Sequence, residues 1–137
     1  MVGMVIVAHA GLGDALVESA NLLCGVNEPI HTIGLYHGDD VEELKKKVQQ
    51  VLKECEQYDE TLVFADLFGG TPCNTAAAVI HESYPNGNVA LYAGVNVPMM
   101  VQAVLDRDNS SLEEMKRELD ILQEESICNV LKKLGME

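Results

Sequence analysis

The stretch from residue 62 to residue 74, LVFADLFGGTPCN, limits the folds open to this chain more than any other. Leu62–Ala65 is a short apolar run of strand-forming residues, which predicts a buried strand. Asp66 follows where that strand would end, and a glycine pair and a helix start come next. A strand, a tight loop and a helix in this order are typical of an α/β protein.

The loop after Asp66 has the residue types of an anion-binding helix start. Gly69 and Gly70 allow positive φ angles and a close approach of a ligand to the backbone. Thr71 suits the N-cap position and Pro72 the first helical position. The first amides of such a helix lack internal partners and face outward, which favours a bound anion. The competing interpretation is an ordinary strand–helix turn with a solvated Asp66, and these residue types alone do not separate the two.

The N-terminus repeats this pattern. The apolar run Met4–Ala8 ends at His9, and Gly11 and Gly13 precede a predicted helix. The carboxyl ends of neighbouring parallel strands lie at one edge of a sheet, where ligands bind. We therefore expect His9 and Asp66 to come together although they are far apart in the sequence. A single histidine after a strand is more often structural, but a histidine paired with a strand-end aspartate is a better functional candidate.

Apolar runs alternate with helical stripes along the whole chain. This alternation predicts an α/β fold in a single domain, residues 1–137, with an open, doubly wound, mainly parallel sheet of four strands and flanking helices. The expected strands are Met4–Ala8, His31–Tyr36, Leu62–Ala65 and Val89–Ala93, and the expected helices are 14–24, 41–56, 72–83, 98–106 and 112–124.

The sequence also predicts how two helices begin and which structure the C-terminal tail adopts. Asp40 with Glu43, and Ser111 with Glu114, have the spacing of capping boxes. The tail Ser126–Leu134 has an apolar stripe that fits a helix, which could continue from the one before it.

Charge and cysteine content narrow the possible partners and cofactors. The 137 residues carry a formal net charge of −13, which argues against nucleic acid or an anionic membrane and mildly favours a basic protein partner. No two cysteines lie close enough for a metal knuckle or a redox pair, so we expect reduced, mostly buried thiols in a cytosolic protein, with no metal and no cofactor. The apolar N-terminal run is too short for a signal peptide, and no stretch is long enough to span a membrane.

Three segments resemble the motifs of a known family. They are Val5–His9, Asp66–Asn74 and Ala93–Met99. Together they are similar to the active-edge motifs of the mannose-class enzyme IIA proteins of the bacterial phosphoenolpyruvate-dependent sugar phosphotransferase system. The similarity runs over nearly the whole chain, with Phe68 where many members have tryptophan and Thr71 where many have serine.

The resemblance implies a phosphotransferase that works through a phosphohistidine. His9 would accept a phosphoryl group on Nε2 from phospho-HPr and pass it to a IIB component, with Asp66 as its acidic partner. The membrane IIC and IID subunits would be indirect partners, and the protein would be cytoplasmic and peripherally associated with that transporter. Members form homodimers in which an antiparallel edge strand is exchanged, which would make the tail Ser126–Leu134 a fifth strand. A IIB domain is fused in some members, and here it is expected to be a separate protein.

The residues themselves suit that chemistry. A carboxylate that accepts the Nδ1 proton of His9 leaves the Nε2 lone pair free to act as a nucleophile. Phosphoryl transfer needs mainly positioning and charge stabilisation, which the amides around Gly69 and Gly70 and the Thr71 hydroxyl would supply.

Other histidines and other functions remain as alternatives. His31, His37 and His81 are expected to be structural or exposed. The chain also resembles the phosphoryl-carrier subunit of a phosphotransferase-linked dihydroxyacetone kinase. A receiver-like regulatory module phosphorylated on Asp66 would need an acidic cluster where His9 stands, and a nucleotide-binding module would need a glycine-rich fingerprint or a Walker lysine, which the sequence lacks.

Overall fold

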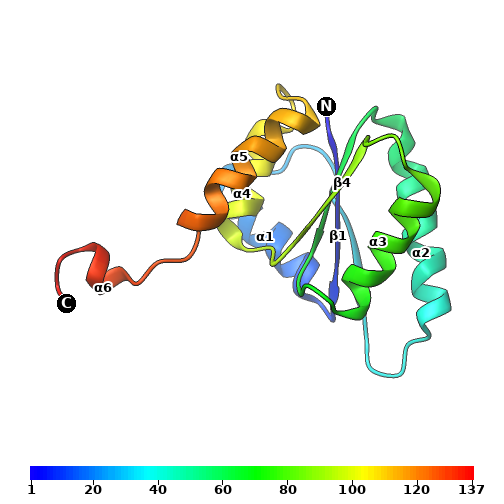
Figure 1. Cartoon of the computed structure of the whole chain (residues 1–137), viewed down its shortest axis with the longest axis horizontal. Coiled ribbons are helices and arrows are strands. Elements are labelled where there is room, and N and C mark those ends of the chain that lie inside the picture. The colour runs from blue at the N-terminus through cyan, green and yellow to red at the C-terminus, as the bar shows by residue number, and fades with distance from the viewer.

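A computed structural model describes residues 1–137 as a parallel sheet covered on both faces by helices (Figure 1). The strands are β1 (Gly3–His9), β2 (His31–Leu35), β3 (Thr61–Ala65) and β4 (Val89–Ala93), and the helices are α1 (Leu12–Cys24), α2 (Val41–Glu54), the 3₁₀ turn η1 (Cys55–Gln57), α3 (Thr71–Ser83), α4 (Val97–Asp106), α5 (Leu112–Glu125) and α6 (Val130–Lys133). The order of the strands in the sheet is β2-β1-β3-β4, and every pair is parallel. The predicted fold class is therefore confirmed.

The two central strands are apolar on both faces because helices cover both. In β1 every residue is buried except His9, and all five residues of β3 are buried. One core, around Met4, Ile6 and Phe64, packs against α1, α4 and α5, and the other, around Val5 and Val63, packs against α2 and α3. Figure 1 shows these two helical layers on opposite sides of the sheet. Continuous apolar runs are what strands buried on both faces require.

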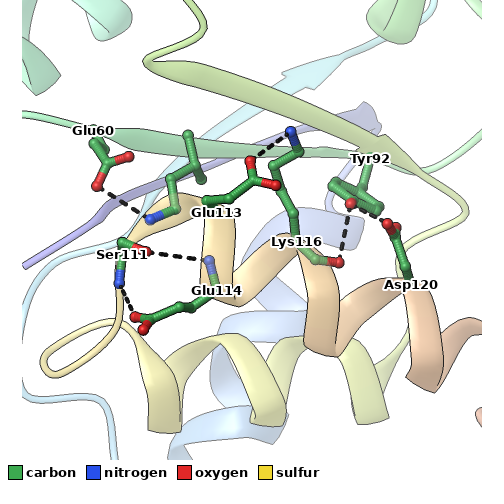
Figure 2. A network of polar contacts seen from close by, with 8 residues as sticks. Glu60, Tyr92, Ser111, Glu113, Glu114, Lys116 and Asp120 are labelled. Atoms are coloured by element: carbon green, nitrogen blue, oxygen red, sulfur yellow. Dashed lines mark hydrogen bonds and ion pairs between the residues drawn. The ribbon is translucent and has the colours of Figure 1, made fainter.

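Polar contacts hold the start of α5 and join the helix to strand β4 (Figure 2). The predicted capping box is present: Ser111 Oγ accepts from the Glu114 amide at 3.2 Å, and Glu114 Oε2 accepts from the Ser111 amide at 2.8 Å. Tyr92 of β4 donates its hydroxyl proton to Asp120 at 2.7 Å. Burial and the adjacent Asp120 carboxylate raise the pKa of Tyr92, so the hydroxyl stays protonated and keeps donating.

Two predicted helix starts differ from the structure. Asp40 caps α2 by accepting from the Glu42 amide at 3.1 Å, and no capping box with Glu43 forms. Thr71 is the first residue of α3 and Gly70 is its N-cap, not Thr71 as predicted. The reason is the left-handed turn at Gly69, with φ of 81°, which already brings Gly70 into position to start the helix.

Within its own chain the tail forms no fifth strand, and it does not continue α5. Helix α5 ends at Glu125, and the separate helix α6, Val130–Lys133, has no buried residue and lies away from the sheet (Figure 1). Asn129 starts this helix by accepting from the Lys132 amide at 3.3 Å. An edge strand needs a neighbour to supply its hydrogen bonds, and this segment does not pair with the sheet of its own chain.

The cysteines are all free, as expected, but only two of the four are buried: Cys55 and Cys73, whereas Cys24 is half-buried and Cys128 is exposed. Burial raises the pKa of the Cys55 thiol to about 11. No helix is both long enough and apolar enough to cross a bilayer.

Candidate functional site

The candidate site lies where two adjacent central strands end. His9 is the last residue of β1, and Asp66 follows the last residue of β3. β1 and β3 are neighbours in the sheet, with Val7 in register with Ala65. From β1 the chain proceeds outward to β2 on one side, and the later strands continue on the other, so this is the switch point at which open parallel sheets bind ligands.

One carboxylate oxygen of Asp66 holds His9 at two points. Asp66 Oδ2 accepts from the His9 backbone amide at 2.9 Å and lies 2.8 Å from the His9 ring nitrogen Nδ1. The His9 side chain is 45% exposed and that of Asp66 is 13% exposed. The acid is therefore enclosed while the imidazole remains accessible, and the contact expected from the sequence is present.

The electrostatics of the pair keep Asp66 ionised. Burial raises the pKa of Asp66, but the hydrogen bonds from the His9 amide and ring outweigh this and leave the pKa below its usual value. An ionised carboxylate only accepts hydrogen bonds, so Nδ1 must carry the proton of this contact. The lone pair of a neutral His9 ring is then on Nε2, the nitrogen turned away from Asp66.

The other oxygen of Asp66 marks this carboxylate as unusual. Asp66 Oδ1 is buried and has no hydrogen-bond partner. A buried acceptor without a protein donor costs free energy, and a catalytic role is one explanation for keeping such a group.

The loop after Asp66 lies close to the His9 imidazole ring. A Cβ atom at Gly70 would lie 3.1 Å from Cε1 of His9, so the absence of a side chain lets the ring rest against the start of α3. The Gly70 amide donates to the Leu67 carbonyl at 3.1 Å, and Asn74 Nδ2 donates to the Gly69 carbonyl at 3.1 Å. Both bonds fix the shape of the loop.

This loop leaves fewer amides for an anion than the sequence predicts. The Gly70 amide is occupied and Pro72 has none, so Thr71 and Cys73 supply the amides without a backbone acceptor. The Thr71 side chain borders a shallow hollow of about 350 Å³ that it shares with Val41 and Lys45 of α2.

Large apolar side chains are exposed in the segments that follow β1, β2 and β3. Phe68 is 88% exposed and Leu67 is 59% exposed, both in the loop that follows Asp66. Tyr36, after β2, and Leu12, at the start of α1, are also exposed. The sequence motif includes Phe68, but its exposure and that of Leu67 were not predicted, although two large apolar residues beside a glycine pair were a visible signal.

A cavity of about 510 Å³ adjoins the turn after His9. Ala10 and Gly34 line it together with the polar side chains Asp14, Asp39 and Lys47. Asp14 accepts a hydrogen bond from the Thr32 hydroxyl. This cavity was not predicted, because its lining comes from three separate segments, within residues 10–14, 32–39 and 47–51.

The other histidines lie elsewhere. His31 Nδ1 is 3.8 Å from a Glu54 carboxylate oxygen, and His37 and His81 are exposed and make no side-chain hydrogen bond. No group of three or more histidine, cysteine or acidic side chains is arranged to hold a metal ion.

The segment Ala93–Met99, the third of those that resemble the family motifs, begins at the end of β4, at the same edge of the sheet as His9 and Asp66. The Val95 amide donates to the Ala65 carbonyl at 3.2 Å, which ties the loop after β4 to the end of β3. Asn96 caps α4 by accepting from the Met99 amide at 3.0 Å.

Comparisons with known proteins agree on one family. The family model EIIA-man, described as "PTS system fructose IIA component", matches residues 3–119. The chain is 29% identical over 131 residues to the PTS system fructose-specific EIIA component of Bacillus subtilis, covering 94% of this chain and 88% of that protein. It is 28% identical over 108 residues to the mannose-specific EIIAB component of Escherichia coli K12, covering 79% of this chain but only 32% of that longer protein. The crystal structure of the phosphotransferase system component EIIA from Streptococcus agalactiae superposes with a TM-score of 0.85 at 27% identity, covering 96% of this chain and 99% of that one.

Proposed function

The chain belongs to the mannose-class EIIA family of the sugar phosphotransferase system, and we propose that His9 is its phosphoryl carrier. In this proposal phospho-HPr donates the group and a IIB component accepts it, for the uptake and phosphorylation of a sugar. The His9–Asp66 pair carries the proposal, since it leaves Nε2 as the accessible nucleophile of a fixed ring. The relatives are named for fructose and mannose, so the sugar is left open.

The chemistry exchanges one N–P bond for another. The Nε2 lone pair of His9 attacks phosphorus while the bond to the donor histidine breaks and its electron pair returns to the donor ring. Positive charge develops on the His9 ring, and the ionised Asp66 at 2.8 Å stabilises it. The free amides of Thr71 and Cys73 would help to neutralise the phosphoryl oxygens.

The exposed apolar side chains suit a site that two proteins must reach in turn. Phe68 and Leu67 project from the loop beside His9 and offer a contact surface to either partner. The net charge of −13 favours a basic partner and speeds its encounter. We place this exchange in the cytoplasm, at the membrane transporter that the IIB component serves.

The tail supports a second part of the proposal, a homodimer. Ile127 is 82% exposed and Leu134 is 66% exposed, and α6 buries none of its residues. Apolar residues gathered on a segment that leaves the body of the protein are typical of a contact with another chain.

Transfer in both directions tests the carrier. Phospho-HPr should label the parent protein with one phosphoryl group, and the labelled protein should pass it to IIB. His9→Ala should abolish labelling and keep the fold, because this strand-end side chain is nearly half exposed. His37→Ala and His81→Ala are matched controls and should label normally. Full labelling of the His9→Ala variant would exclude His9 as the acceptor.

A further inference from the structure

The turn that follows His9 has an unusual backbone. Ala10 is the only residue other than glycine with a positive φ, 52°, a region in which side chains are disfavoured. Its amide donates to the Leu35 carbonyl of β2 at 2.8 Å, so the pairing of β1 with β2 continues one residue beyond β1. The turn is therefore folded over β2 and does not point away from the sheet.

Gly34 makes room for this turn. It is the β2 residue in register with Ala8, and a Cβ atom at this position would overlap the Ala10 carbonyl oxygen. The same atom would lie 2.9 Å from the Tyr36 ring and 3.3 Å from the Ala10 carbonyl carbon. Because the obstacle is backbone, a side chain at residue 34 would force β2 and the turn apart.

A movement of this turn would displace the His9 imidazole, because the ring belongs to the residue just before it. His9 is bonded to Ala10, and its amide and its ring both depend on the same oxygen of Asp66. On another side the ring already rests against Gly70, where even a methyl group would be 3.1 Å away. The ring thus has little freedom to compensate for a shift of its own backbone.

We propose that Gly34 is a positioning residue for phosphoryl transfer, one that holds the His9 ring in line by leaving space for the Ala10 carbonyl. This role rests on the proposed function of His9. This role could not be predicted from the sequence, because Gly34 lies inside a strand and 25 residues after His9. A glycine within a strand often marks a close approach of another backbone.

The test compares Gly34→Ala with Gly11→Ala. Gly11 lies in the same turn, but a Cβ there would meet only the Tyr36 hydroxyl, at 3.9 Å. We expect single-turnover transfer from saturating phospho-HPr to slow about tenfold or more in Gly34→Ala, as small displacements of a reacting group do. Gly11→Ala should stay within about twofold of the parent, because its added methyl group has space. In ¹⁵N NMR the His9 ring signals should shift only in Gly34→Ala, reporting an altered Nδ1–H contact with Asp66.

A double variant separates positioning from stability and covers the case in which Gly34→Ala does not fold. Ala10→Gly releases the constraint on φ at residue 10, so Gly34→Ala combined with Ala10→Gly should regain thermal stability by letting the turn move aside. Transfer should remain slow and the ring signals shifted, since the turn is still displaced. Parent-like transfer in either folded variant that carries Gly34→Ala would overturn the proposal while leaving His9 as the acceptor. Failure of the proposed carrier function would give a different result, because phospho-HPr would then not label even the parent protein.

Discussion

In the proposed transfer, Asp66 would act on His9 through its charge as well as through its position. The Asp66→Asn variant keeps a hydrogen-bonding group beside Nδ1 but cannot stabilise the cationic ring formed during transfer. A hydrogen bond to a charged group contributes roughly 1.5–3 kcal/mol, so transfer from phospho-HPr should be about ten- to a hundredfold slower in rapid-quench measurements. Asp108→Asn, in an exposed loop, removes the same charge elsewhere and should transfer normally. If Asp66→Asn were as fast as the parent, Asp66 would not assist the reaction.

The lowered pKa of Asp66 also predicts how stability depends on pH. The folded protein holds the ionised carboxylate through the two hydrogen bonds from His9, and its pKa lies below that of the unfolded chain. This contribution is fully present above the unfolded pKa of about 3.9 and is lost as the pH falls through the lower, folded value. Urea unfolding at pH 5 and at pH 3 should show a smaller loss of stability in Asp66→Asn than in the parent. Equal losses in the two proteins would contradict the role of these bonds.

Among the helices, α5 offers the clearest local test. The Ser111→Ala variant removes the hydroxyl that accepts from the Glu114 amide. Removing such a cap costs about 1 kcal/mol, which urea unfolding can measure. Ser110→Ala changes the neighbouring serine, which makes no side-chain hydrogen bond in the structure, and should leave stability unchanged within about 0.5 kcal/mol. If both variants lost the same stability, the capping box would not be the cause.

The strands could be predicted closely because burial on both faces leaves an unbroken apolar run in the sequence. Each predicted strand begins and ends within one residue of the observed one. The contact of His9 with Asp66 followed from the same fact, since adjacent parallel strands end at one edge. Helix starts were less certain: the turn at Gly69 decides that Gly70 and not Thr71 caps α3, and φ angles are not visible in a sequence.

Contacts between backbones of distant segments could not be predicted. The space that Gly34 leaves for Ala10 depends on how β2 lies against the turn after β1. The occupied Gly70 amide depends on the folded shape of its loop. The tail is a third case, because an apolar stripe does not say whether it meets its own chain or another one.

For the molecule as a whole, the tail predicts self-association. Sedimentation at micromolar concentration should give a homodimer for the full chain and a monomer after truncation before Ser126. The truncated protein loses the exposed Ile127 and Leu134 but keeps the sheet and both helical layers, so its circular dichroism should remain α/β in character. A full chain that stays monomeric at high micromolar concentration would contradict the proposed homodimer.

The proposed role of His9 can be checked by finding which atom of the protein carries the transferred phosphate. The protein would be labelled by phospho-HPr, and the modified residue located by peptide mass spectrometry and ³¹P–¹⁵N NMR. We expect one acid-labile, base-stable N–P bond at Nε2 of His9, the ring nitrogen opposite the Asp66 contact at 2.8 Å. A phosphate on Asp66, recognised by its base-labile acyl linkage, or on any other histidine would contradict it.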